Sequence, residues 1–240
     1  MIINNNKINN KINNKKKNNR NSNNQNIRNK SPKIVSINEI SEGNRMIKEF
    51  PNSLLSLNSN SNLGPLSGYE LEYNPKIWNE KSSIRTTHNC YSYALGKIRP
   101  GLDSKAQPGY ASGHNHINNK DYECNEFYNR LRKDSPGTYL QRFDVACRPG
   151  FYKIFLALDP QNDYHWWRQD GDNNKGYWSH KPGSTEVKNV DASGKKIINP
   201  LLSDRNFKSL NYHKPCFFAC IYSDLSKSMS TIYGRKYSYF

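Results

Sequence analysis

One cysteine of this chain lies where a helix is expected to begin. Asn89, a favoured N-cap residue, precedes Cys90, and Gly96 suits the position just after a helix end, which predicts a helix near Cys90–Leu95. The free backbone amides at a helix start stabilise a thiolate and can hold a developing oxyanion. Cys90 is therefore a candidate nucleophile. The alternative is a small buried hydrophobic residue, as most free cysteines are.

Two histidines lie on either side of a predicted hairpin. Aromatic strands at 164–169 and 177–181 flank a cluster rich in Gly, Asp and Asn, which is a typical hairpin pattern. A loop over 171–174 would place His165 directly opposite His180 on one sheet face. Together with the cysteine, this pattern predicts that His165 takes the thiol proton and that His180 orients the His165 imidazole. The alternative is that both histidines pack beside Trp166 and Trp178 as half-buried aromatic residues.

The order of these elements resembles the NlpC/P60-type cysteine hydrolases of the papain-like superfamily. In that family a cysteine opens a helix that packs on an antiparallel sheet, and a histidine and a polar residue follow on successive strands. The segment Asn89–Ser92 looks like the nucleophile position, and His165 and His180 match the two strand residues. The resemblance covers residues 89–222, and residues 99–149 form an insertion without a counterpart in that pattern.

This resemblance implies an α+β domain with a papain-like core, in which the helix bearing Cys90 packs on an antiparallel sheet. It implies a cysteine peptidase or amidase that cleaves an amide or peptide bond through a thioester acyl-enzyme. Cys90 would be the nucleophile, His165 the base and His180 the residue that orients the base. This chemistry needs no cofactor, and the sequence does not choose among peptide and amide substrates.

The elements expected around these residues are of mixed type. A second helix is predicted at 125–132, ahead of a series of strands rich in aromatic and branched residues. The predicted strands are 151–158, 164–169, 177–181 and 216–222. Helices followed by an antiparallel series of strands indicate an α+β domain.

Charge and composition divide the chain of 240 residues into three parts. Residues 1–38 hold nine of the 36 Lys and Arg residues and none of the 20 Asp and Glu residues. Their Asn-rich composition predicts a disordered basic tail. Residues 39–64 are expected to form a short helix and a linker, and residues 65–240 the hydrolase domain.

The basic tail supports an alternative function. Its cations could make weak contact with a nucleic acid or an anionic surface, so the chain could be a non-catalytic, hydrolase-like protein of a virion or a nucleic-acid complex.

The N-terminal residues show no apolar region of a secretory signal, and no run of 18 apolar residues predicts a membrane span. The expected location is the cytoplasm, or a virion assembled in the host cytoplasm.

The remaining cysteines and two further histidines give weaker signals. The five cysteines form no CxxC pair, and their odd number argues against a disulfide framework and favours a reducing compartment. Cys216 and Cys220 are expected on one strand face, toward the core. His114 and His116 form an H-x-H pair ahead of Cys124, but no paired ligand spacing accompanies them. The sequence therefore predicts no metal site.

Overall fold

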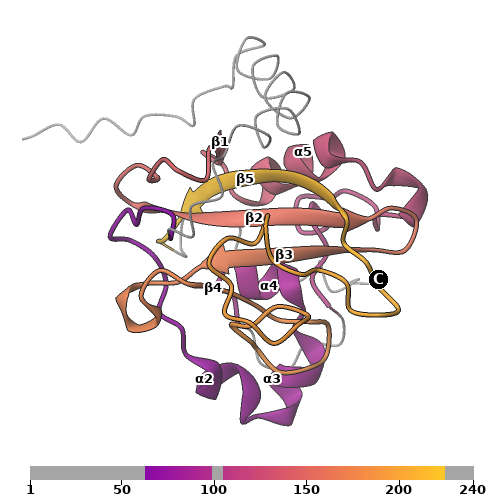
Figure 1. The fold of residues 1–240 in the computed structure, drawn as a ribbon. Coiled ribbons are helices and arrows are strands. Elements are labelled where there is room, and N and C mark those ends of the chain that lie inside the picture. The colour runs from indigo at the N-terminus through magenta and orange to yellow at the C-terminus, as the bar shows by residue number, and fades with distance from the viewer. Residues whose placement is uncertain (1–62, 99–104, 225–240) are drawn as a thin grey trace, which may run out of the picture. The chain divides into compact units, whose positions relative to one another are not determined.

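The fold is built on one antiparallel sheet, seen in a computed structural model that describes residues 63–98 and 105–224 (Figure 1). The strands lie side by side in the order β1-β5-β2-β3-β4, and each neighbouring pair is antiparallel. They are β1 (Tyr139–Gln141), β2 (Phe151–Asp159), β3 (Asp163–Gln169), β4 (Trp178–His180) and β5 (Lys214–Tyr222). The long strands β2 and β5 therefore lie inside the sheet, and the short strands β1 and β4 lie at its edges.

The four strands expected from the sequence are confirmed, with small changes at their ends. All nine residues of β2 are buried, which explains why this strand is a nearly continuous run of apolar and aromatic residues instead of an alternating one. β1 is not among the expected strands, because three residues are too few to show a period.

Short helices precede the sheet, and a longer helix lies within the insertion at 99–149. The helices are α2 (Pro75–Asn79), α3 (Ser82–Thr87), α4 (Cys90–Ala94) and α5 (Cys124–Asp134), with 3-10 turns η1 (Asn119–Asp121) and η2 (Asp172–Asn174). α4 and α5 confirm the two helices predicted from the sequence. α2 and α3 are not predicted, because each is too short to show a helical period of apolar residues.

The two faces of the sheet carry separate cores. On one face, Tyr91 of α4 and Phe127 of α5 pack against strand residues that include Trp166. Irregular segments cover the other face with side chains such as Ile197 and Tyr212. Successive strand residues point to opposite faces, so the even-numbered residues of β2 and β3 face the helices. The predicted α+β class, with the helix of the candidate nucleophile packed on an antiparallel sheet, is confirmed.

Two disulfide bonds join the insertion to β5, and the prediction of a chain without a disulfide framework is wrong. Cys124, at the start of α5, pairs with Cys216, and Cys147, after β1, pairs with Cys220. Cys90 is the free cysteine among the described residues. One free thiol and two pairs also give an odd total, so the number of cysteines did not exclude pairing. Such bonds persist in oxidising environments, contrary to the expected reducing compartment.

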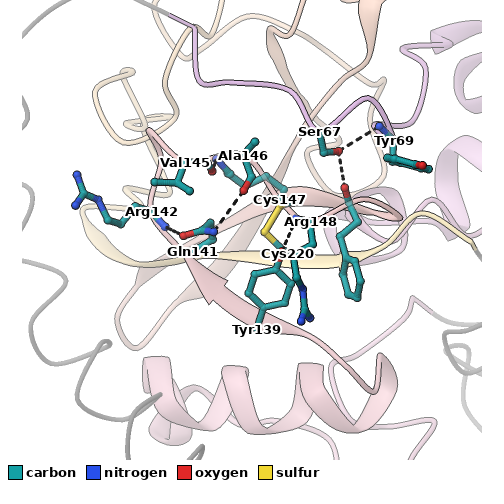
Figure 2. Close-up of a disulfide and its surroundings, with 12 residues drawn as sticks. Ser67, Tyr69, Tyr139, Gln141, Arg142, Val145, Ala146, Cys147, Arg148 and Cys220 are labelled. Atoms are coloured by element: carbon teal, nitrogen blue, oxygen red, sulfur yellow. Dashed lines mark hydrogen bonds between the residues drawn. A yellow bond between two sulfur atoms is a disulfide. The ribbon is translucent and has the colours of Figure 1, made fainter.

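Figure 2 shows the bond between Cys147 and Cys220 and the contacts that support it. The backbone N–H of Arg148 donates to the Tyr139 hydroxyl at 2.7 Å, and the Arg148 guanidinium lies 4.2 Å from the centroid of the same ring. The Ser67 hydroxyl donates to the backbone carbonyl of Phe151, the first residue of β2, at 2.6 Å. The connection from β1 to β2 is therefore held by covalent, aromatic and hydrogen-bonding contacts.

Cys216 and Cys220 point to opposite faces of β5, which corrects the prediction that they share one. Consecutive residues of β2 pair with Phe217 and Pro215, so Cys216 is an extra residue in a β-bulge. A bulge interrupts the alternation of side chains along a strand. Cys216 therefore joins the core beneath the helices, whereas Cys220 lies on the other face.

Some expectations fall outside the part of the chain that the structure describes. These are the disordered tail at 1–38 and the short helix and linker at 39–64, of which only the last two residues are described. Across residues 63–98 and 105–224, the helices are too short and too polar to cross a membrane.

Candidate functional site

Polar contacts fix the start of α4, where Cys90 is the first residue. The Asn89 side chain accepts a hydrogen bond from the Ser92 backbone N–H at 3.2 Å, and the Ser92 hydroxyl accepts one from the Asn89 N–H at 2.9 Å. The Asn89 amide also donates to the Ala106 carbonyl at 2.8 Å. This reciprocal cap confirms the helix start expected from the sequence, and the bond to Ala106 ties Asn89 to the segment that leads to Gly109.

The Cys90 thiol is buried against the backbone of β3. Its sulfur lies 3.8 Å from the Tyr164 carbonyl oxygen, to which the thiol donates. Burial and then the charge of Asp163 raise the pKa of Cys90 to about 12, although the backbone N–H groups of Trp166 and Tyr91 act in the opposite direction. The resting thiol is therefore protonated at neutral pH.

The two histidines share a sheet face, as expected, but their register differs from the expected one. Trp167 lies directly opposite His180, in place of His165. The connection between the strands is longer than predicted, because the Asp170 N–H bonds to the Tyr177 carbonyl at 3.0 Å. A shift of two residues keeps the face unchanged, since side chains alternate with a period of two. The two histidines are therefore diagonal neighbours.

A chain of hydrogen bonds sets the tautomer of each histidine. His180 Nε2 lies 3.0 Å from the Val190 carbonyl oxygen, which can only accept, so Nε2 carries the hydrogen. Burial lowers the pKa of His180 to about 4, so its Nδ1 is an acceptor for the His165 Nε2–H at 2.7 Å. Burial and the charge of His180 lower the pKa of His165 well below its usual value. Neutral His165 is left with a lone pair on Nδ1, which a general base requires.

Aromatic rings enclose both imidazoles. Tyr212 stacks on His165 with 5.0 Å between ring centroids, and Trp167 stacks on His180 at 5.8 Å. Phe207 is tilted against both histidines, at 6.4 and 5.7 Å. The histidines therefore pack among aromatic rings, as the alternative prediction has it, but these rings are not Trp166 and Trp178, and both histidines are buried fully instead of by half.

The structure joins His165 to His180 but leaves Cys90 on the other face of the sheet. Cys90 packs with the core beneath the helices, whereas the His165 ring contacts Tyr212 of the opposite core. Within the described residues, the hydrogen bonds of the Cys90 thiol and of the His165 ring do not connect the two. The sulfur nevertheless touches Tyr164, the chain neighbour of His165, where β3 extends beyond β4. The thiol and the imidazole thus approach one open strand edge from opposite faces.

Three further polar residues near this edge are not predicted from the sequence. Asp163 lies two residues before His165 on the same face, accepts a hydrogen bond from the Tyr212 hydroxyl at 2.8 Å, and has its pKa raised by burial. Lys181 follows His180, donates to three backbone carbonyls, and has its pKa lowered to about 8 by burial. The alternation of β3 could have revealed Asp163. Tyr212 lies too far along the chain for any local pattern to find it.

A buried carboxylate holds the loop beside α4. Asp134, the last residue of α5, accepts hydrogen bonds from the Tyr91 hydroxyl at 2.7 Å, the Gly109 N–H at 2.7 Å and the Ser112 hydroxyl at 3.1 Å. Gly109 has a φ of +78°, and a Cβ there would lie 2.8 Å from the Arg130 side chain, so this turn requires glycine. Asp134 therefore links the insertion to the residue that follows the candidate nucleophile.

The histidine pair of the insertion is not part of a metal centre in this structure. Across residues 63–98 and 105–224, no group of three or more His, Cys, Asp or Glu side chains is placed to hold a metal ion. Cys124, the candidate third ligand of His114 and His116, is bound in a disulfide and has no thiolate to offer.

Comparison with known proteins identifies a related shell protein. No family model and no solved structure matches the chain. The chain is 38% identical over 133 residues to insoluble matrix shell protein 1 of Ruditapes philippinarum, in a match that covers 55% of this chain and 80% of that protein. At this identity and coverage, the two proteins share a fold and a common origin. The chain belongs to the same family as this insoluble matrix shell protein.

Proposed function

We propose that the domain is a thiol hydrolase that cleaves an amide or peptide bond, with Cys90 as nucleophile, His165 as base and His180 as the residue that orients the base. The observation that carries this proposal is the hydrogen-bonded chain from His165 through His180 to the Val190 carbonyl. This chain fixes the His165 imidazole in one tautomer and leaves its Nδ1 unprotonated. The proposal includes a papain-like core and a relation to the NlpC/P60-type hydrolases that the sequence resembles.

In the proposed reaction, His165 Nδ1 takes the proton of the Cys90 thiol while the sulfur attacks the substrate carbonyl carbon. The tetrahedral intermediate collapses to a thioester, and the His165 imidazolium gives its proton to the departing amine. Water then attacks the thioester, with His165 again as base, and releases the carboxylic acid and the thiol. His180 accepts the Nε2–H of His165 throughout and stabilises the imidazolium.

The resting geometry sets a condition on this reaction. With the pKa of Cys90 raised to about 12 and that of His165 lowered, the resting pair is neutral. The thiolate therefore forms only as the proton moves to His165 during attack. This transfer requires the His165 ring or α4 to shift toward the shared strand edge, as catalytic contacts often tighten only when substrate is bound.

The test is the acetylation of Cys90 by p-nitrophenyl acetate, followed by mass spectrometry of the intact chain and its peptides. A buried thiol with a high pKa reacts slowly on its own, so His165-dependent acetylation reports the proposed base. We expect His165→Ala to slow acetylation by roughly a hundredfold or more. His116→Ala removes an exposed imidazole of the insertion and is expected to leave the rate unchanged. Equal rates in the native chain and in His165→Ala would refute the proposal.

A second candidate function is a structural role in an insoluble extracellular matrix. Two observations favour it: the relative is an insoluble matrix shell protein, and two disulfides suit an oxidising environment. Under this proposal the folded, oxidised chain is expected to sediment and to resist extraction by strong salt. Cys90→Ala should sediment equally, which separates this function from catalysis. A native chain that stays in the supernatant at every concentration would contradict the matrix role.

A further inference from the structure

Tyr212, which stacks on the candidate base, is held at its ring, its hydroxyl and its backbone. The ring lies 5.0 Å from that of His165 at an interplanar angle of 30°. Its hydroxyl donates to Asp163 at 2.8 Å. The Tyr212 carbonyl accepts from Arg205 Nε at 2.9 Å, and the Tyr212 N–H donates to the Arg205 carbonyl at 3.2 Å. With an exposed fraction of 4%, this side chain cannot turn without breaking several contacts.

The other aromatic contacts of His165 are tilted or edge-on, so Tyr212 is the described ring that stacks on its plane. Trp167 meets the imidazole edge-on, at 4.5 Å and 80°. The hydrogen bond to His180 fixes the position of one ring nitrogen but still permits rotation about the axis of that bond. A flat ring stacked on one face of the imidazole opposes that rotation. Because the Nδ1 lone pair lies in the imidazole plane, the residue that sets this plane sets the direction in which the base can accept a proton.

We infer that Tyr212 is a positioning residue for His165, held in place by Asp163, and that the pair aims the Nδ1 lone pair. The inference rests on the proposed hydrolase function for its role in catalysis. The electron-rich face of Tyr212 would also favour the imidazolium that forms when the thiol proton is transferred. Other charged or titratable groups that act on Tyr212 or His180 include Cys90, Asp159, Lys188 and Asp191.

The test measures hydrogen exchange of the His165 Nε2 proton by NMR in the full, oxidised, ¹⁵N-labelled chain. Its rate is expressed relative to that of the Ile154 amide in the middle of β2, which reports opening of the sheet. Tyr212→Leu removes the stacked ring and is expected to raise the relative rate roughly tenfold, the effect of losing one aromatic pair. Tyr212→Phe keeps the ring but loses the bond to Asp163, so a smaller, severalfold rise is expected.

A matched control is Tyr152→Phe, which also removes a buried tyrosine hydroxyl, in this case one that donates to the Ala94 carbonyl at 2.8 Å. It should leave the relative rate unchanged. If the relative exchange rate of the His165 Nε2 proton is unchanged in Tyr212→Leu, the inference is overturned. If Tyr212→Leu does not fold, an unchanged relative rate in Tyr212→Phe overturns it. The same variants are then acetylated at Cys90, where Tyr212→Phe should react more slowly than Tyr152→Phe. A native chain that is not acetylated refutes the hydrolase proposal, while the exchange data still decide whether Tyr212 holds the ring.

Discussion

Changing both Cys147 and Cys220 to alanine removes one crosslink and is expected to destabilise the fold by a calculable amount. The two bonds overlap in sequence, because Cys147 lies between Cys124 and Cys216. While the Cys124–Cys216 bond is intact, the shortest covalent path from Cys147 to Cys220 uses it. The path runs from Cys147 back to Cys124, crosses the disulfide to Cys216 and continues to Cys220. This loop holds about 27 residues, which is the length used in the chain-entropy treatment. Closing a loop of that length lowers the entropy of the unfolded chain enough to stabilise the fold by about 3.5 kcal/mol.

The overlap makes the two bonds non-additive. Removing either bond alone leaves the same path and costs about 3.5 kcal/mol, but the last remaining bond, Cys124–Cys216, spans a sequence separation of 92 residues and contributes about 4.6 kcal/mol. The second removal should therefore cost about 1 kcal/mol more than the first. For a domain of this size, each single removal should lower the midpoint of thermal unfolding by about 10 °C.

Urea unfolding of the native chain and of the single and double bond variants, without reductant, measures these differences. Thiol titration of the denatured, unreduced chain gives an independent check: one reactive thiol, Cys90, is expected before reduction and all five afterwards. Five reactive thiols before reduction, or unfolding midpoints that do not respond to loss of the bonds, would refute the reasoning.

Three further predictions concern charge. Below pH 6.5 the unfolded chain binds a proton on His180, whereas the folded chain excludes it down to about pH 4. The free energy of unfolding should therefore fall by up to roughly 3 kcal/mol as the pH is lowered across this window. Urea unfolding at a series of pH values should show a smaller fall in His180→Asn, and equal falls in the two chains would contradict this. Asp134→Asn places an amide opposite three hydrogen-bond donors and should lower the free energy of unfolding by roughly 2–3 kcal/mol in the same assay. The control Asp144→Asn, at an exposed position, should lower it by about 0.5 kcal/mol or less. Equal losses of stability would argue against a role for the buried cluster. If the tail binds DNA, the affinity of the full chain should fall steeply as the salt concentration rises, and deleting residues 1–38 should abolish the binding. Fluorescence anisotropy measures both, and binding retained by the truncated chain would show that the tail is not responsible.

Local pattern was sufficient for the elements that carry the candidate site. The cap at Asn89 located α4, and the aromatic composition of the hairpin located β3 and β4. The shared face of His165 and His180 was predicted correctly even though the register was not, because a shift of two residues keeps a side chain on its face. Periodicity is therefore a stronger guide to which residues share a face than to which residues are paired.

Features that depend on distant parts of the chain could not be predicted. The bulge at Cys216 is created by pairing with β2, and the two disulfides require the insertion to fold against β5. The partners of Cys90 are also distant: it rests on the backbone of Tyr164, and its thiol is kept neutral by burial. A helix start alone suggested an activated thiolate, whereas desolvation outweighs the backbone N–H groups in the folded chain.

The crosslink from Cys124 to Cys216 also decides how the domain would respond to tension. A pulling force applied at the chain termini passes from Cys124 directly to Cys216, so β2, β3 and β4 lie in a closed loop outside the loaded covalent path. Most of β5 follows Cys216 and lies on that path. The histidine pair is inside this loop, but α4 precedes Cys124 and lies on the loaded path. Stretching would therefore pull directly on α4, with Cys90, and on the part of β5 that follows Cys216, while the segment that holds both imidazoles is spared a direct covalent load.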